Sequence, residues 1–194
     1  MRVISGRFKS IPLTSAKSCT RPTTDRTKEA IFSRLDSWDV IENSRVLDLF
    51  AGTGALGIEA LSRGAKELVA VEANSQAAAL IGHTAKVLQK SSSWDNSLSM
   101  LVSRKRAEQF VNDYAGDAFH LIFIDPPYAY ETSDCELLLQ QIIGNKLASA
   151  EADTLIVLER SARSSIPNIP DGWELFDNRH YGETAVMFIQ SKRS

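Results

Sequence analysis

The stretch L47-D-L-F-A-G-T-G-A-L-G57 decides how the rest of this chain is interpreted. It begins within an apolar strand, R45-V-L-D-L-F50, and continues into a segment with helical spacing that ends at about Arg63. Its glycines fit the pattern G-x-G-x-x-G, which is weak alone but stronger where it follows a strand and opens a helix. Glycine permits a tight turn and lets the backbone approach a ligand closely. The stretch therefore predicts a ligand-binding loop between a strand and a helix.

Two acids near this loop indicate the kind of ligand that it binds. Glu72 ends the next apolar run, twenty residues after Gly52, where a carboxylate can accept both hydroxyls of a ribose. Asp48 precedes Gly52 by four residues, and its negative charge is poorly placed for the pyrophosphate of a dinucleotide. It suits a cationic ligand such as the ammonium and sulfonium of S-adenosylmethionine. The alternatives are a packing turn that binds nothing and a buried acid held by backbone N–H groups.

Outward from the loop, apolar strands alternate with helical segments, which predicts an α/β, Rossmann-like fold with a mostly parallel sheet. The seven expected strands lie at 45–50, 67–72, 98–102, 119–124, 154–159, 173–180 and 184–190, and further helices are expected at 75–89, 105–113 and 135–143. The last two strands have no helix between them, so the last strand is expected to be antiparallel. No repeat or long linker interrupts residues 1–194. We therefore expect a single domain, with a core over 39–194 and an N-terminal extension over 1–38.

The N-terminal extension differs from the core in charge. A loose alternation over 2–13 predicts a short β-hairpin, and Thr23 or Thr24 is expected to cap a helix that ends at about Ser37. Residues 1–34 carry eight basic and two acidic side chains, whereas the whole chain has a net charge of −2. A basic segment on an acidic body is typical of proteins that bind a polyanion such as nucleic acid. A solvated segment with chance lysines is the alternative.

The composition argues against several other classes of protein. No apolar run reaches the roughly 20 residues of a membrane helix, and the N-terminus lacks the apolar stretch of a secretory signal. Cys19 and Cys135 have no C-x-x-C spacing, and the three histidines share no ligand-like spacing. We therefore expect a cytoplasmic protein with no disulfide framework, no metal site and no membrane partner.

A second informative stretch, D125-P-P-Y128, follows the apolar strand 119–124. Proline fixes φ and has no N–H, and a residue before proline is pushed to an extended conformation. The Asp125 carboxylate and the Pro126 carbonyl are therefore expected to be held as two acceptors, which can orient the exocyclic amine of a base toward a methyl sulfonium. The Tyr128 ring can stack on the base. A strand-ending turn with Tyr128 as a lid over the core is the alternative.

Together these motifs resemble the RsmD family of class I S-adenosylmethionine-dependent methyltransferases, which methylate N2 of a guanine in 16S ribosomal RNA. The resemblance covers essentially the whole chain, and the stretches that carry it are R2-V-I-S-G-R-F-K9, R21-P-T-T-D-R-T-K-E-A-I-F32, Leu47 to Ala65, V71-E-A-N74, D125-P-P-Y128 and Y181-G-E-T184. The long glycine stretch and R21-P-T-T-D-R26 are specific, whereas D-P-P-Y marks amino-methyltransferases generally. The resemblance implies a monomeric, metal-free enzyme that acts on the 966-type guanine of 16S rRNA in an assembling small ribosomal subunit.

The resemblance also implies roles for individual residues. The methyl-donor site would comprise Asp48, Phe50, Gly52, Gly54, Glu72, Ala73 and Ala107. The base site would comprise Asp125, Pro126, Pro127 and Tyr128. RNA contacts would come from Arg2, Arg7, Lys9, Arg21, Thr23, Arg26 and Lys28, with Arg21, Arg26 and Lys28 as the best candidates for positioning phosphates. Many relatives carry an acid or amide for the adenine amino group where this chain has Arg106. The backbone at Ala107 or the Glu108 carboxylate would then make that contact.

Three other functions fit the same motifs. D-P-P-Y does not separate guanine from adenine, so the substrate could be adenine N6 in DNA, or a protein glutamine. The glycine loop also occurs in NAD-binding oxidoreductases, although Asp48 and the lack of an evident catalytic Lys, His or Tyr set disfavour that class. The third alternative is a non-catalytic RNA-binding module, which the intact Asp125 and glycine loop disfavour. No covalent nucleophile is expected, because neither cysteine lies in a plausible place.

Overall fold

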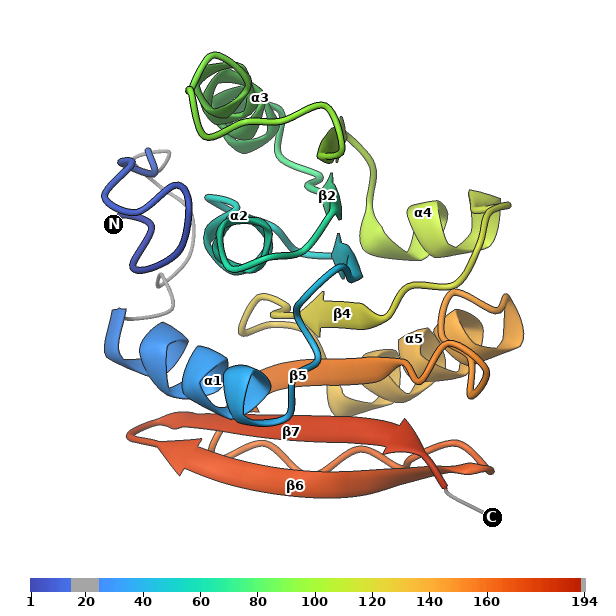
Figure 1. Ribbon diagram of the computed structural model, residues 1–194. Coiled ribbons are helices and arrows are strands. Elements are labelled where there is room, and N and C mark those ends of the chain that lie inside the picture. Colours follow the sequence, from blue (N-terminus) through green and yellow to red (C-terminus); the bar gives the residue numbers. More distant parts are fainter. Residues whose placement is uncertain (15–24, 193–194) are drawn as a thin grey trace.

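Helices cover both faces of a central sheet in the computed structural model, which describes residues 1–14 and 25–192 (Figure 1). The elements in chain order are α1 (Asp25–Ser37), β1 (Arg45–Asp48), α2 (Ala55–Ser62), β2 (Glu67–Val71), α3 (Ser75–Gln89), β3 (Ser99–Ser103), α4 (Ala107–Asp113), β4 (Leu121–Ile124), α5 (Thr132–Gly144), β5 (Leu155–Ser161), β6 (Trp173–Tyr181) and β7 (Thr184–Ser191). The elements predicted from residue 45 onward are all present, and their predicted ends differ from the observed ones by three residues at most.

The strands of the described chain form a seven-stranded sheet in the order β3-β2-β1-β4-β5-β7-β6. Parallel pairing extends from β1 through β2 to β3 and, on the other side, through β4 to β5. β7 is antiparallel to both of its neighbours, β5 and β6, which confirms the predicted antiparallel last strand. The strand order reverses between β1 and β4, and ligands of open α/β sheets bind in the crevice beyond the strand ends at that point.

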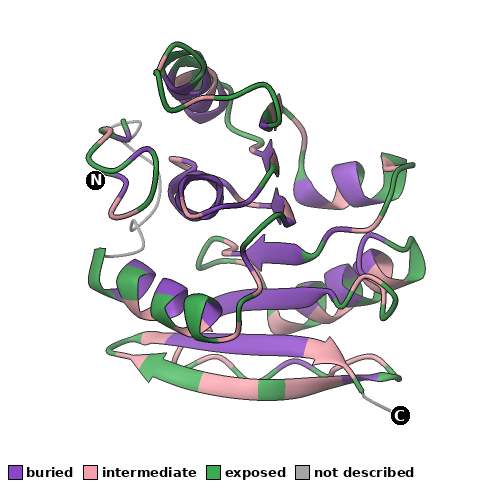
Figure 2. Ribbon diagram, viewed as in Figure 1, coloured by how far each residue is buried: buried purple, intermediate pink, exposed green. Residues whose placement is uncertain are grey.

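Each face of the sheet has its own apolar core, because successive side chains of a strand point to opposite faces. Val46 and Phe123 pack with α1, α2 and the N-terminal segment, whereas Leu47 and Ile122 pack with α4 and α5. The central strands are buried along their length, and β6 at the sheet edge is largely exposed or half-buried (Figure 2). Burial on both faces explains why the central strands are continuous apolar runs in the sequence.

Residues 1–13 form only the base of the short hairpin that the alternation predicted, where the N–H of Val3 donates to the carbonyl of Ile11 and the N–H of Leu13 to the carbonyl of Met1, at 3.0 Å each. One antiparallel bridge joins Arg2 and Pro12, but the backbone N–H groups of Ile4 and Ser5 donate to the Glu59 carboxylate of α2, at 2.8 and 3.0 Å. The pairing is short because α2 supplies the donors that follow it, at Ile4 and Ser5, with acceptors, so these donors need no second strand. The N-terminal segment is thereby anchored beside α2 (Figure 1).

The predicted helix of the N-terminal extension is present as α1, which begins at Asp25. The proposed cap, Thr23 or Thr24, lies outside the described residues. Within residues 1–14 and 25–192, no helix is both long enough and apolar enough to cross a membrane.

Candidate active site

A cleft of about 1490 Å³ lies beyond the carboxyl ends of β1, β2, β4 and β5. It contains every residue that was predicted to hold the target base and all but one of those predicted to hold the methyl donor. The cleft walls include Asp48, Phe50, Gly52, Glu72, Ala73 and Ala107 from the donor set, and Asp125, Pro126, Pro127 and Tyr128 from the base set. Motifs that are up to about eighty residues apart in the sequence therefore share one cavity at the reversal of strand order.

Gly54 is the predicted donor-site residue that is not on the cleft wall. It has φ +77° and precedes the first residue of α2, and a Cβ at this position would lie only 2.8 Å from Cδ1 of Ile58. Its N–H donates to the carbonyl of Ala51 at 2.6 Å. Gly54 is therefore explained by the tight turn into α2, which favours glycine at positive φ, and not by contact with the cavity.

The Asp48 carboxylate is buried at the base of the cleft, where its Oδ2 accepts the N–H of Gly57 at 3.0 Å. Burial raises the pKa of Asp48 to about 7, opposed by the Gly57 hydrogen bond and assisted by the negative charges of Asp125 and Glu72. Asp48 is therefore both a buried acid held by a backbone N–H and an acid that lines the cleft. A cation bound beside it would favour its ionised form.

Glu72 holds the glycine loop in place. Its Oε2 accepts the N–H of Gly52 at 2.8 Å, and its Oε1 accepts the N–H of Asn74 at 2.7 Å. Asn74 in turn caps α3, because its side chain accepts the N–H groups of Gln76 and Ala77 at 3.0 Å each. A carboxylate oxygen can accept more than one hydrogen bond. Glu72 can therefore orient the loop and still receive hydroxyl groups of a ligand.

The D125-P-P-Y128 turn extends β4 into the cleft beside the glycine loop. The Tyr128 ring is 73% exposed, so it is available for stacking and does not act as a lid over the core. The carbonyl of Pro127 accepts the N–H of Tyr130 at 2.9 Å. The Tyr130 ring meets the Phe50 ring edge-on, with centroids 5.3 Å apart, and this contact joins the turn to the strand that leads into the glycine loop.

Both groups that were considered for the adenine contact, the Ala107 backbone and Glu108, lie on the cleft wall. Oε1 of Glu108 accepts the hydroxyl of Tyr130 at 2.8 Å, and Arg106 lies 3.4 Å from Oε2. Burial alone would raise the pKa of Glu108, but hydrogen bonds from its own backbone N–H, from Tyr130 and from Arg106 outweigh this effect and lower it. Glu108 is therefore ionised and can accept hydrogen bonds.

Glu159, the last buried residue of β5, is a cleft residue that was not expected from the sequence. It is only 3% exposed, and burial together with the charges of Asp125 and Asp48 raises its pKa well above the ordinary value. The sequence did carry a signal for it. Glu159 closes a buried apolar strand with an acid, the same feature that identified Glu72.

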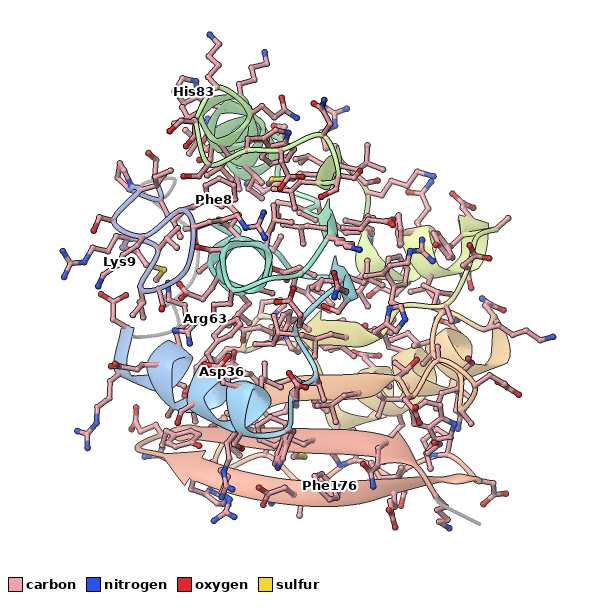
Figure 3. The ribbon with its side chains drawn as sticks, viewed as in Figure 1. Phe8, Lys9, Asp36, Arg63, His83 and Phe176 are labelled. Carbon is pink, nitrogen blue, oxygen red and sulfur yellow. The ribbon has the colours of Figure 1, made fainter. Side chains whose placement is uncertain are left out.

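Lys28 was predicted to contact RNA, but the structure buries it. Its side chain has 0% exposure, and its Nζ donates to the carbonyl of Arg2 at 2.8 Å and lies 3.2 Å from Oε2 of Glu59. This ammonium cannot reach a phosphate, because α1 packs it between α2 and the N-terminal segment. Arg63 lies between α2 and α1 and also pairs with Glu59, at 2.9 Å (Figure 3).

The other predicted RNA contacts are on the surface where they are described. Arg2 and Lys9 are exposed, and Lys9 lies at the outer edge of the N-terminal segment (Figure 3). Arg26 is exposed and lies on the wall of the cleft. Arg7 is also exposed, but its guanidinium is 3.1 Å from the Asp95 carboxylate. Arg21 and Thr23 lie outside the described residues.

The sequence matches known proteins along nearly its whole length. The profile of the family described as Conserved hypothetical protein 95 matches residues 1–190. YlbH of Bacillus subtilis is 33% identical over 99% of this chain and 100% of its own length, and ribosomal RNA small subunit methyltransferase D of Escherichia coli is 28% identical over 98% of this chain and 89% of its own. The solved structure of yhhF from Escherichia coli superposes with a TM-score of 0.83 at 27% identity, covering 99% of this chain and 98% of that one. The chain therefore belongs to this family, the RsmD family, and is an S-adenosylmethionine-dependent methyltransferase.

Proposed function

We propose that this enzyme transfers a methyl group to the exocyclic N2 of a guanine, the 966-type guanine, in 16S rRNA of the assembling small ribosomal subunit. It would act as a monomer in the cytoplasm. Relatives that are named ribosomal RNA small subunit methyltransferase D support the substrate class. The observation that carries the proposal is the single cleft that holds both the D125-P-P-Y128 turn and the glycine loop with Glu72. Membership of a methyltransferase family excludes the NAD-dependent oxidoreductase.

The donor side of the cleft fits S-adenosylmethionine in the chemistry of its groups. Glu72 offers carboxylate oxygens to ribose hydroxyls, and Asp48 offers an acid to the cationic end. Glu108 or the backbone at Ala107 lies on the same wall for the adenine amino group. When bound, S-adenosylmethionine supplies a methyl group that the sulfonium charge activates.

The base side of the cleft fits a weak amine nucleophile. The Asp125 carboxylate and the Pro126 carbonyl accept the two hydrogens of N2, which orients its lone pair toward the methyl group. Tyr128 stacks on the base once it is flipped out of its helix or loop. Asp125 takes the proton that N2 loses as N2 bonds to the methyl carbon and the bond from that carbon to sulfur breaks, which leaves S-adenosylhomocysteine.

The test is methylation of small-subunit particles from a strain that lacks the enzyme, with the product nucleoside identified by mass. We expect N2-methylguanosine, and we expect Asp125→Ala to lower the rate by about 100-fold or more. Asp113→Ala is a matched control, because Asp113 is an exposed acid at the end of α4, outside the cleft wall. If the product were N6-methyladenosine or methylated protein, the substrate would be adenine or protein and not guanine. Particles that bind the protein but gain no methyl group would favour the non-catalytic RNA-binding module.

A further inference from the structure

Glu159 is a buried acid in the cleft for which the proposed reaction has no role. Its Oε1 has no hydrogen-bond partner anywhere within residues 1–14 and 25–192. Leaving a buried polar atom unpaired costs free energy, so native proteins keep few such atoms, and each calls for an explanation. Because Glu159 lies on the cleft wall, a ligand bound there can bring a hydrogen-bond donor to this carboxylate.

The sheet register places Glu159 beside Asp125. Ile124 of β4 is paired with Leu158 of β5, so the residues that follow them, Asp125 just past β4 and Glu159 within β5, lie side by side on strands that are about 4.8 Å apart. Phe123 and Val157 both pack in the core under α1 and α2. Asp125 and Glu159 each follow one of them by two residues, so their side chains leave the sheet on that same face. Within the described ranges no group of three or more acids, histidines and cysteines has the arrangement of a metal site.

Two neighbouring acceptors match one base better than the other. Guanine presents two adjacent kinds of donor, the N2 amine and the N1–H, whereas adenine presents its N6 amine next to N1, which is an acceptor. A carboxylate beside the one that holds the amine therefore attracts N1–H of guanine and repels N1 of adenine. We propose that Glu159 accepts the N1–H of the target guanine while Asp125 holds its N2 amine, and that this pair of acids selects guanine over adenine.

This inference rests on the proposed guanine-N2 methylation and resolves a choice that the D-P-P-Y motif leaves open. The groups that face Glu159 and the bound base act on its ionisation in opposite directions. Burial and the charges of Asp125 and Asp48 favour the protonated form of Glu159 in the ligand-free cleft, whereas a hydrogen bond from N1–H favours the ionised form. A bound guanine therefore supplies the donor that the ionised carboxylate lacks.

The test replaces the target guanine with 2-aminopurine, which keeps the N2 amine but has an acceptor at N1. Small-subunit particles are reconstituted with 16S rRNA that carries either base at the methylated position, and the rate of N2 methylation is measured for each. We expect the wild-type enzyme to prefer guanine by about 10- to 100-fold. In Glu159→Gln the side-chain amide can donate to N1 of 2-aminopurine, so we expect the preference to fall by about tenfold or more.

Two further variants separate specificity from folding. Glu159→Ala removes the acceptor without adding a donor, so the preference should fall less than in Glu159→Gln. Glu174→Gln makes the same chemical change on β6, outside the cleft wall, and should keep the wild-type preference. A loss of folded protein lowers both rates equally and leaves their ratio unchanged. An unchanged ratio in both Glu159 variants overturns the inference while N2 methylation stands, whereas a wild-type enzyme that never methylates guanine overturns the proposed function itself.

Discussion

At the scale of single residues, the cleft gathers acids whose charged forms the fold disfavours. Asp48 and Glu159 are both buried, and burial is the main cause of the raised pKa of each. Such perturbed acids cluster at functional sites because catalysis and binding use groups that folding alone would not select. Ligands that bring a cation or a hydrogen-bond donor to these acids recover part of the free energy that their burial costs.

The raised pKa of Asp48 predicts how stability depends on pH. Its pKa is about 7 in the folded protein and near the ordinary value of 3.8 when unfolded, so between these values the native state binds more protons than the unfolded chain. The free energy of unfolding therefore falls as pH rises through this window, by roughly 4 kcal/mol at most from this residue. Urea unfolding at about pH 5 and about pH 8 measures the fall.

Asp48→Asn is the matched variant for this measurement, because it removes the titrating group and nearly preserves its shape. The fall in stability between the two pH values should be smaller in Asp48→Asn than in the wild type. It should not vanish, because the raised pKa of Glu159 acts in the same direction. An equal fall in both proteins would show that Asp48 does not titrate in this range.

Lys28 and Lys9 of the N-terminal extension should differ in what their mutation affects, protein stability for Lys28 and RNA binding for Lys9. Lys28→Met breaks a buried ion pair with Glu59 and should lower the free energy of unfolding by about 3 kcal/mol. Lys9→Ala removes an exposed charge, so stability should change by less than about 0.5 kcal/mol. If Lys9 contacts a phosphate, the salt dependence of binding to small-subunit particles should weaken by about one counterion.

Equilibrium denaturation and particle binding over a range of salt concentrations measure these two effects. If Lys28→Met kept full stability but weakened the salt dependence of particle binding, Lys28 would be an RNA contact after all. Lys9→Ala with an unchanged salt slope would remove Lys9 from that set.

At the scale of elements, the N-terminal segment depends on a close approach to α2 at Gly6. Gly6 has φ +80°, and a Cβ there would overlap the carbonyl oxygen of Ser62, which accepts the N–H of Arg7 at 2.8 Å. Gly6→Ala should therefore release the segment from α2. We expect faster proteolysis within residues 1–13 and weaker methylation of particles, because the exposed basic residues of the segment lose their position.

Gly172→Ala is the control for this prediction. Gly172 has φ +81°, nearly the same as Gly6, but nothing lies within 4 Å of a Cβ built there. The backbone strain of roughly 1 kcal/mol is common to both variants, so the difference between them isolates the overlap with Ser62. Equal protease sensitivity in the two variants would contradict the anchoring role of this contact.

The same elements show what could be predicted from the sequence and what could not. The parallel strands are buried on both faces, so they are continuous apolar runs, and acids or glycines at their ends locate the cleft. The short extent of the N-terminal hairpin escaped prediction because the backbone donors of Ile4 and Ser5 bond to the Glu59 side chain, 55 residues away from Ile4. Lys28 escaped for the same reason, since a lysine on a helix is usually exposed and only the fold brings Glu59 to it. Glu159 could have been identified as the acid that ends the buried apolar run of β5.

At the scale of the whole molecule, the cleft exists only in the folded chain. Its walls include the ends of β1, β2, β4 and β5, the start of α4, the turn between β6 and β7, Arg26 and Thr27 of α1, and Met1. A ligand that fills it therefore binds the native state alone and raises the free energy of unfolding by about 2.7 kcal/mol at 100 times its dissociation constant. For a chain of this length, we expect S-adenosylhomocysteine to raise the melting temperature by roughly 5–10 °C.

Glu72 makes this last prediction specific to the donor side of the cleft. Glu72→Gln places an amide N–H₂ against one of two backbone donors, Gly52 or Asn74, because both carboxylate oxygens are used. The loop then loses one of its two anchors and the ribose loses an acceptor, so the thermal shift should shrink to less than half. Glu136→Gln, a change at a half-buried position of α5 outside the cleft wall, should keep the full shift. NAD at the same concentration should give no shift in any of the three proteins, because Asp48 opposes a pyrophosphate at this loop. A shift with NAD that matched the one with S-adenosylhomocysteine would contradict the role given to Asp48.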